Sequence, residues 1–349
     1  MLRLSASGSR CLLRHQPRHP AQVLFVRLQH VSAPASIEET PRLRRSYLYV
    51  PSSDERKLNK SLQTNSDVII YDLEDSVDER SKDLAREKLH KFLTDPEIVL
   101  PFRERIAVRV NAVSTRHFKK DVETLIGING ISTIVLPKIH GKNDLDNCYK
   151  PICKKLEKTR NFKGPLNIVA SIESAQALVL IDRITNWEYK GKRKHAVLSG
   201  LLFAAEDYCA DTSITRTKNF QELLYARSKI ATYARAYKLE AIDMVCTALH
   251  DPSQLQLECQ SARELGFSGK QAIHPDQVET ILNTFVPSDK EIERAQKILS
   301  QMAESNKEGK GAFGLVSESG ASEMIDEPMV KQATNTLRLA KAAGKIPTD

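Results

Sequence analysis

The 349-residue sequence has no long apolar run. Its longest nearly apolar stretch, residues 196–205, lies between Lys194 and Glu206, whereas a helix that spans a bilayer needs roughly 18 to 20 such residues. We therefore expect no transmembrane segment and no membrane partner. With 41% apolar and 28% charged residues, the chain also differs from collagen-like, coiled-coil and disordered sequences. It has enough material for one large domain or two modest ones.

Acidic residues are absent before Glu38. The same segment contains five Arg, no Lys and several Ser, a composition typical of a mitochondrial transit peptide. We predict that residues 1–40 direct the protein to the mitochondrial matrix. A disordered basic tail is the alternative, and a secretory signal fits less well because Arg27 interrupts the short apolar run.

Without those five Arg, 47 basic side chains remain against 44 acidic ones, and the net charge of +8 becomes about +3. The basic balance therefore describes import rather than nucleic-acid binding, and no basic motif interleaved with aromatic residues is present. The six cysteines are scattered, without a Cys-x-x-Cys or a paired Cys/His motif. Neither a zinc site nor a disulfide framework is indicated.

Short β-branched or apolar runs recur from Arg45 onward and alternate with amphipathic stretches long enough for helices, which indicates repeated βα units. Because continuous apolar strands are typical of parallel sheets covered on both faces, eight units predict an α/β fold, a (β/α)8 TIM barrel over residues 41–287. A doubly wound open sheet is the alternative, although no Gly-x-Gly-x-x-Gly turn follows any predicted strand. The predicted strands are residues 46–50, 67–73, 106–110, 132–136, 166–172, 195–199, 240–245 and 268–273.

Polar side chains follow these strands, at the end where a barrel builds its active site. Glu173 and Asp207 follow the fifth and sixth strands without His or Cys, so their oxygens favour a hard cation such as Mg²⁺. Arg109, at the third strand, offers a planar set of donors to a carboxylate or a developing oxyanion. An ion pair with Glu74 or Asp75 is the alternative for Arg109.

Basic residues follow the first strand. Residues 52–55 show the Ser-to-Glu spacing of a capping box, which predicts a helix that starts at Ser52. Arg56 and Lys60 share one face of this helix and could bind phosphate, unless they form an ordinary solvated face. At the last strand, Pro275 after His274 is predicted at a first helical position, with exposed backbone donors beside it.

The predicted C-terminal part, residues 288–349, is a helical extension that forms a lid. Ser288 and Glu291 have capping-box spacing. Residues 304–322 are rich in Gly, Ser and charge, which predicts a mobile connector, and order is expected to resume at residue 324. Asp326 then lies just ahead of a helix that runs to about residue 343, so helix capping is the alternative to a chemical role.

Together these motifs resemble the citrate lyase β-subunit-like family of CoA-ester lyases, of the HpcH/HpaI aldolase type, from about residue 45 to residue 343. The resemblance implies a TIM barrel that forms a homotrimer and binds Mg²⁺ and a CoA thioester. The sequence departs from the usual family pattern at Ser52, at residues 247–251 and in the longer segment 314–323. The segments that carry the resemblance are 45–51, 72–75, 109–111, 136–138, 172–174, 206–208, 266–275 and 324–326.

The resemblance also implies a reaction, the Mg²⁺-dependent cleavage of (3S)-citramalyl-CoA to acetyl-CoA and pyruvate. A malyl-CoA lyase or a malate-synthase-like condensation of acetyl-CoA with a 2-oxo acid is the enzymatic alternative, and a non-catalytic CoA-binding protein is the alternative from another class. By matching position, Glu173 and Asp207 would hold the metal, Arg109 would contact the reacting oxygens and Asp326 would be the acid/base. The implied CoA contacts are Tyr49, Arg56, Lys60, Ile273 and His274.

Overall fold

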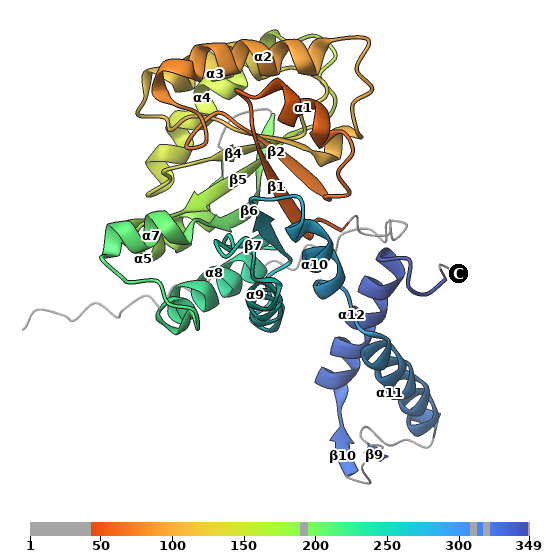
Figure 1. Cartoon of the computed structure of the whole chain (residues 1–349). Coiled ribbons are helices and arrows are strands. Elements are labelled where there is room, and N and C mark those ends of the chain that lie inside the picture. The colour runs from red at the N-terminus through yellow and green to blue at the C-terminus, as the bar shows by residue number, and fades with distance from the viewer. Residues whose placement is uncertain (1–42, 189–194, 308–312, 317–321, 348–349) are drawn as a thin grey trace, which may run out of the picture. The chain divides into compact units, whose positions relative to one another are not determined.

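The computed structural model describes residues 43–188, 195–307, 313–316 and 322–347 (Figure 1). The predicted transit peptide, residues 1–40, lies outside these residues. Within the described ranges, no helix combines the length and the apolar character that crossing a membrane requires.

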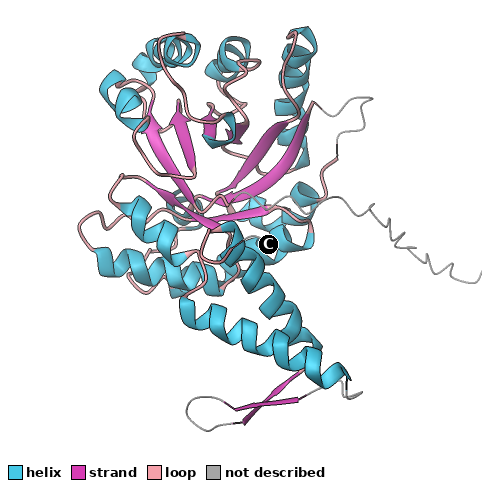
Figure 2. Ribbon diagram, turned by 90° about the vertical axis from the view of Figure 1, so that its right-hand side faces the viewer, coloured by secondary structure: helices cyan, strands magenta, loops and turns pink. Residues whose placement is uncertain are grey.

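Eight parallel strands close into a barrel in sequence order, with β1 paired to β8 (Figures 1 and 2). The predicted TIM barrel is therefore confirmed, and the doubly wound alternative is wrong. The strands are β1 (Ser46–Pro51), β2 (Val68–Asp72), β3 (Ile106–Arg109), β4 (Thr133–Leu136), β5 (Leu166–Ile172), β6 (Ala196–Phe203), β7 (Glu240–Asp243) and β8 (Gly269–Ala272).

Helices connect the strands and cover the outside of the barrel (Figure 2). In α4, for example, Leu145, Tyr149 and Ile152 are buried while the intervening polar residues face outward, the spacing of an amphipathic helix. The helices are α1 (Glu55–Ser61), α2 (Lys82–Thr94), α3 (Arg116–Leu125), α4 (Lys142–Lys158), α5 (Ala175–Val179), α6 (Ile181–Thr185), α7 (Ala205–Thr212), α8 (Leu224–Ala236), α9 (Pro252–Glu264) and α10 (Gln277–Thr284).

Side chains that alternate along each strand divide the apolar core into two layers. One buried cluster includes Tyr47, Ile70 and Ala107 and fills the barrel. A larger cluster, with Leu48 and Ile69 among its members, packs between the strands and the helices. The strands are therefore apolar on both faces, which is why the sequence shows continuous rather than alternating apolar runs.

Two predicted helix starts differ from the structure. The cap of α1 is Asp54, whose side chain accepts a hydrogen bond from the Lys57 backbone N at 3.1 Å. Ser52 instead continues the β1 ladder, because its backbone N donates to the Asp72 carbonyl at 3.0 Å. Likewise α10 begins at Gln277, two residues after Pro275.

The sixth strand also differs from its predicted bounds. It runs to Phe203 rather than to Ser199, because its pairing with β5 continues to the end of that strand. This extension carries Asp207 four residues past the strand end, into the first turn of α7.

The C-terminal part consists of α11 (Asp289–Lys307), β9 (Phe313–Val316), β10 (Ser322–Ile325) and α12 (Glu327–Ala342). The predicted capping box is present, since the Ser288 backbone N donates to Glu291 Oε2 at 2.7 Å and its Oγ accepts from the Glu291 N at 3.3 Å. The described residues of the predicted connector form regular structure, because α11 reaches Lys307 and β9 pairs with β10 as an antiparallel hairpin. Residues 308–312 and 317–321 of the connector lie outside the described residues.

A small apolar cluster joins the two long helices of this part. Ile298 of α11 packs with Ile325 and with Ala333 of α12, and all three are buried. Ile325 thereby attaches the end of β10 to the two helices, which lie side by side in Figure 1. Residue 326 follows directly, so the packing of Ile325 positions its backbone next to the start of α12.

Candidate active site

Strand register places three polar side chains at the carboxyl end of the barrel. Tyr49, Asp72 and Arg109 each follow, two residues on, a member of the interior apolar cluster, so they form the next layer along the barrel axis. The register pairs Asp72 directly with Arg109. A charged pair therefore closes the apolar interior.

Arg109 is held by three carboxylates. Its Nε and Nη2 each donate to an oxygen of Asp72 at 2.7 Å, and its Nη1 lies 3.0 Å from Glu74 Oε2 and 3.1 Å from Asp75 Oδ2. Its guanidinium carbon also lies 4.7 Å from the centroid of the Tyr49 ring. Burial by itself lowers the pKa of this guanidinium, but the carboxylates, Asp72 first, raise it well above its ordinary value. The alternative prediction of an ion pair with Glu74 or Asp75 is confirmed, with Asp72 as the main partner.

Glu74 is a buried carboxyl group in this cluster. Its residue is 7% exposed, and its Oε2 accepts no hydrogen bond from any described residue although it lies beside Arg109. Burial raises the pKa of Glu74 to about 8, against the opposing effect of Arg109, and the charges of Asp75 and Glu173 add to the rise. A carboxyl group at the barrel mouth is thus poised to keep its proton near neutral pH.

Glu173 and Asp207, the predicted metal ligands, meet at Lys138. The Lys138 backbone N donates to Glu173 Oε1, and its ammonium lies 2.5 Å from Asp207 Oδ1 and 3.7 Å from Glu173 Oε2. Burial raises the pKa of Glu173 to about 7, while Lys138 acts in the opposite direction. The structure therefore brings the two predicted carboxylates together around one cation.

This arrangement fits a hard cation. The oxygens of both carboxylates converge on a single ammonium group, and oxygen donors are what Mg²⁺ prefers. No cluster of three or more His, Cys, Asp or Glu suited to a metal occurs in the described part of the chain. A metal bound by the pair would therefore take its other ligands from water or from a substrate.

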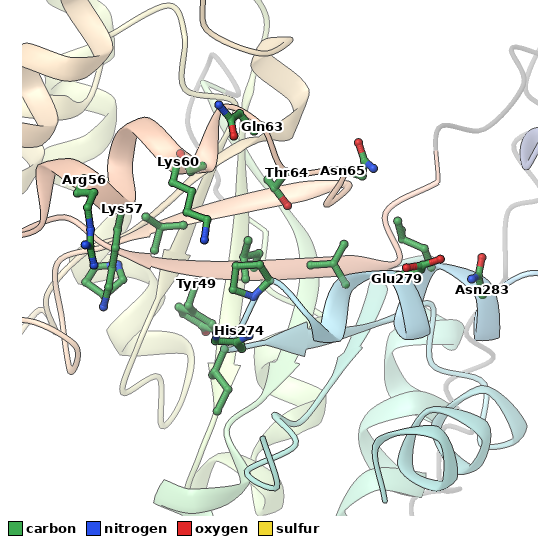
Figure 3. A pocket seen from close by; sticks show the side chains of 18 residues that line it. Tyr49, Arg56, Lys57, Lys60, Gln63, Thr64, Asn65, His274, Glu279 and Asn283 are labelled. Atoms are coloured by element: carbon green, nitrogen blue, oxygen red, sulfur yellow. The ribbon is translucent and has the colours of Figure 1, made fainter. Parts of the chain in front are cut away.

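A cavity of about 1010 Å³ lies between the β1–α1 and β8–α10 segments (Figure 3). We call it the groove. All five residues that the family resemblance assigns to CoA contacts line it. They are Tyr49, Arg56, Lys60, Ile273 and His274.

Arg56 and Lys60 are exposed, and among the described residues neither forms an ion pair, so their charges are available to an anion in the groove. The expected free backbone donor at Ile273 is instead satisfied by Gln277 Oε1 at 2.9 Å. We call Arg109 and the three carboxylates around it the ionic cluster. Tyr49 links the groove to this cluster, because its ring stacks on Arg109 while its hydroxyl donates to Gln271 Oε1 at 3.0 Å.

Asp326 is the N-cap of α12. Its Oδ1 accepts a hydrogen bond from the Met329 backbone N at 3.4 Å. Within the described ranges no hydrogen bond or ion pair joins Asp326 to a side chain of the barrel, so this predicted acid/base is not brought to Glu173 and Asp207 by its own chain. The capping alternative is confirmed as its local role.

Lys138, Asp72 and Glu74 were not among the predicted site residues. Each follows or ends a strand, so the rule that located Glu173 marks them too. The sequence does not show which of these residues are close in space. Asp72 and Arg109 are 37 residues apart in the chain, and Lys138 is at least 35 residues from either member of the carboxylate pair.

The fold and the site define a (β/α)8-barrel protein with a pair of carboxylates around Lys138 and a basic groove at its carboxyl end. A family model, HpcH/HpaI aldolase/citrate lyase, matches residues 45–275. The chain belongs to this family, as the motifs had indicated.

Curated relatives match along nearly the whole chain. The mitochondrial citramalyl-CoA lyase of Homo sapiens is 34% identical and the match covers 94% of this chain and 97% of that protein. The citrate lyase subunit beta of Leuconostoc mesenteroides is 32% identical, over 86% and 94%. Among solved structures, the protein CitE from Mycobacterium tuberculosis in complex with magnesium, acetoacetate and coenzyme A has 26% identity and a TM-score of 0.67, over 88% and 100%.

The raised pKa of Glu74 predicts a pH-dependent stability. The Glu74 carboxyl group has a pKa of about 8 in the folded chain, against an ordinary value of 4.5 in the unfolded chain. Its contribution to the free energy of unfolding is therefore fully present below pH 4.5 and is lost as the pH rises toward about 8. Glu74→Gln removes this loss, so its free energy of unfolding relative to the native protein should increase between pH 5 and pH 8. Urea unfolding across that range measures it, with exposed Glu97→Gln as the control. Parallel profiles for Glu74→Gln and the native protein would contradict it.

Proposed function

We propose that the protein is a Mg²⁺-dependent lyase of the mitochondrial matrix that cleaves (3S)-citramalyl-CoA to acetyl-CoA and pyruvate. The observation that carries the proposal is the position of Tyr49, which lines the groove and also stacks on Arg109 in the ionic cluster. A thioester whose phosphates lie at Arg56 and Lys60 would thereby extend its acyl end toward the carboxylate pair. The citramalyl-CoA lyases among the relatives support the substrate, and the CitE complex supports magnesium and coenzyme A.

The chemistry divides between the metal and the chain. Glu173 and Asp207 would hold Mg²⁺, which when bound supplies charge stabilisation to the substrate's 2-hydroxy-carboxylate oxygens. Asp326, acting first as the base, would take the proton of the hydroxyl, the carbon–carbon bond would break to release pyruvate, and the electron pair would remain on the acetyl-CoA enolate. Arg109 offsets negative charge at the reacting oxygens. Asp326 then donates a proton to the enolate carbon, which completes acetyl-CoA.

Asp326 would reach a barrel mouth in a neighbouring subunit. Within its own chain it caps α12 and contacts no barrel side chain among the described residues. A homotrimer in which the C-terminal part closes the adjacent barrel would bring the acid and the carboxylate pair together and exclude water. The extended pair of helices, α11 and α12, supports this arrangement.

The direct test is a thioester panel of citramalyl-CoA, malyl-CoA and citryl-CoA, assayed with Mg²⁺ and with chelator. We expect citramalyl-CoA to be preferred, although one methyl group in a pocket contributes only roughly 1 to 3 kcal/mol, so malyl-CoA should show slower turnover. Preference for malyl-CoA would establish the rival activity. No cleavage of any thioester would favour a non-catalytic CoA-binding protein.

Removal of either metal ligand should abolish Mg²⁺-dependent cleavage. Glu173→Ala and Asp207→Ala each leave one carboxylate, which cannot hold the cation in place against water. The far-UV circular dichroism of both variants should match the native protein, and Glu97→Ala controls for the loss of an exposed carboxylate. Native turnover in either variant would contradict the assignment of Glu173 and Asp207 as the metal ligands.

Removal of the groove cations should weaken thioester binding. Arg56→Ala/Lys60→Ala should raise the KM about tenfold to a hundredfold, as expected for two lost charged contacts, and change kcat less. The KM should also depend less on salt. Lys150→Ala/Lys154→Ala, an exposed pair with the same spacing in α4, is the matched control. An unaltered KM in the groove variant would show that Arg56 and Lys60 form an ordinary solvated helix face and do not bind the thioester.

Shared sites predict complementation. Asp326→Ala subunits and Glu173→Ala subunits are each expected to be inactive, but mixed under exchange they should regain activity, because some sites then combine an intact metal pair with Asp326 from the neighbour. Kinetic assay after demonstrated subunit exchange measures the recovery. Absence of recovery would count against the shared site, and full activity of Asp326→Ala alone would leave this residue a helix cap.

A further inference from the structure

Lys138 engages both carboxylates of the predicted metal pair through two different groups. Its backbone N donates to Glu173 Oε1, while its ammonium lies 2.5 Å from Asp207 Oδ1. The backbone of Lys138 is in the left-handed region, with φ of 53°, which costs a residue other than glycine free energy. That conformation, directly after Pro137, is what allows one residue to direct both groups at the pair.

The ammonium solves an electrostatic problem that the pair creates. Glu173 is almost fully buried, and two carboxylates that face one point repel each other unless a cation lies between them. The Lys138 ammonium is placed 3.7 Å from Glu173 Oε2 in addition to its contact with Asp207. A divalent cation held by the same oxygens would need this space, so the ammonium and the metal exclude each other.

We propose that Lys138 is a tethered counter-ion, which occupies the carboxylate pair in the metal-free protein and which a divalent cation displaces from Asp207. The proposal rests on the proposed function in one respect, namely that Glu173 and Asp207 are the cation ligands. The backbone N–H of Lys138 does not need to move, so Glu173 stays in position during the exchange. The Lys138 side chain is 35% exposed and therefore has a path toward solvent.

Because of this exchange, either the ammonium or the metal always balances the negative charges of Glu173 and Asp207. The exchange also sets the affinity for metal, because each binding event must displace the ammonium. The chain thus tunes its metal affinity with a residue that is not itself a ligand. Lys138 is a positioning residue in this role.

The first experiment measures the Kd of Mg²⁺ by calorimetry on the full-length metal-free protein. Lys138→Met should bind Mg²⁺ about tenfold more tightly, which corresponds to about 1.4 kcal/mol, because the competitor is gone. Its metal-free Tm should fall, and the rise in Tm on addition of Mg²⁺ should exceed that of the native protein. Lys138→Arg restores the charge and should return the Kd toward the native value. Lys142→Met, an exposed lysine at the start of α4, is the matched control.

The second experiment needs no variant, so it decides the matter even if Lys138→Met does not fold. Brief acylation with acetic anhydride, followed by peptide mass spectrometry, reports how available each lysine amine is. Mg²⁺ should raise the acylation of Lys138 several-fold while that of Lys142 stays constant.

The outcomes separate this proposal from the proposed function. Unchanged or weaker Mg²⁺ binding by Lys138→Met, or unchanged acylation of Lys138, overturns the tethered counter-ion but leaves the metal site intact. Failure of the native protein to bind Mg²⁺, or binding that persists in Glu173→Ala/Asp207→Ala, overturns both.

Discussion

The hydrogen bonding of β1 to β8 is the constraint on which the candidate site depends. This pairing joins segments more than 200 residues apart, with Leu48 opposite Ala272. It closes the barrel, so that strand ends far apart in sequence surround one mouth. It also places the β1–α1 segment opposite the β8–α10 segment, and the groove lined by Arg56 and His274 lies between them. Barrel closure therefore creates the basic groove and the ionic cluster together.

Closure brings several carboxylates together at the barrel mouth, and most of them face a cation. Asp72 faces Arg109, and the Glu173 and Asp207 pair faces Lys138. Deeper in the barrel wall, fully buried Arg227 donates to both oxygens of Asp243 at 2.9 and 3.0 Å. Removing one partner of such a buried pair is far more costly than the pair is stabilising, so these charges are mutually dependent.

Glu74 is the exception to this balance. It shares Arg109 with two other carboxylates and receives no hydrogen bond on Oε2 from the described residues. Its carboxyl group therefore responds to burial more than to charge. The charges of Asp75 and Glu173 raise the pKa of Glu74 further, so the protonation of Glu74 depends on the charges of its neighbours.

The sequence by itself determined the barrel and the positions of Glu173, Asp207, Arg56 and Lys60. Strand periodicity and strand ends are local signals, because burial on both faces selects continuous apolar runs, and parallel strands carry their functional residues at one end. Local signals failed at the start of α1, where both Ser52 and Asp54 could cap the helix. Asp54 is the cap, because the backbone of Ser52 forms a ladder hydrogen bond with β2, which the local sequence does not reveal. Local signals also failed at residues 313–316 and 322, where the composition gave no sign that β9 and β10 pair as a hairpin.

Only the tertiary structure decided the partners. From the sequence, Arg109 is either a donor to a substrate carboxylate or oxyanion or an ion-pair partner of Glu74 or Asp75, whereas the register of β2 and β3 places Asp72 beside it as the main partner. In the sequence Lys138 is marked only by its place after a strand, and its contacts with the carboxylate pair arise only because β4, β5 and β6 are neighbours in the barrel. The physical reason is that electrostatic partnership depends on distance in space, which barrel closure sets and which sequence separation does not reveal.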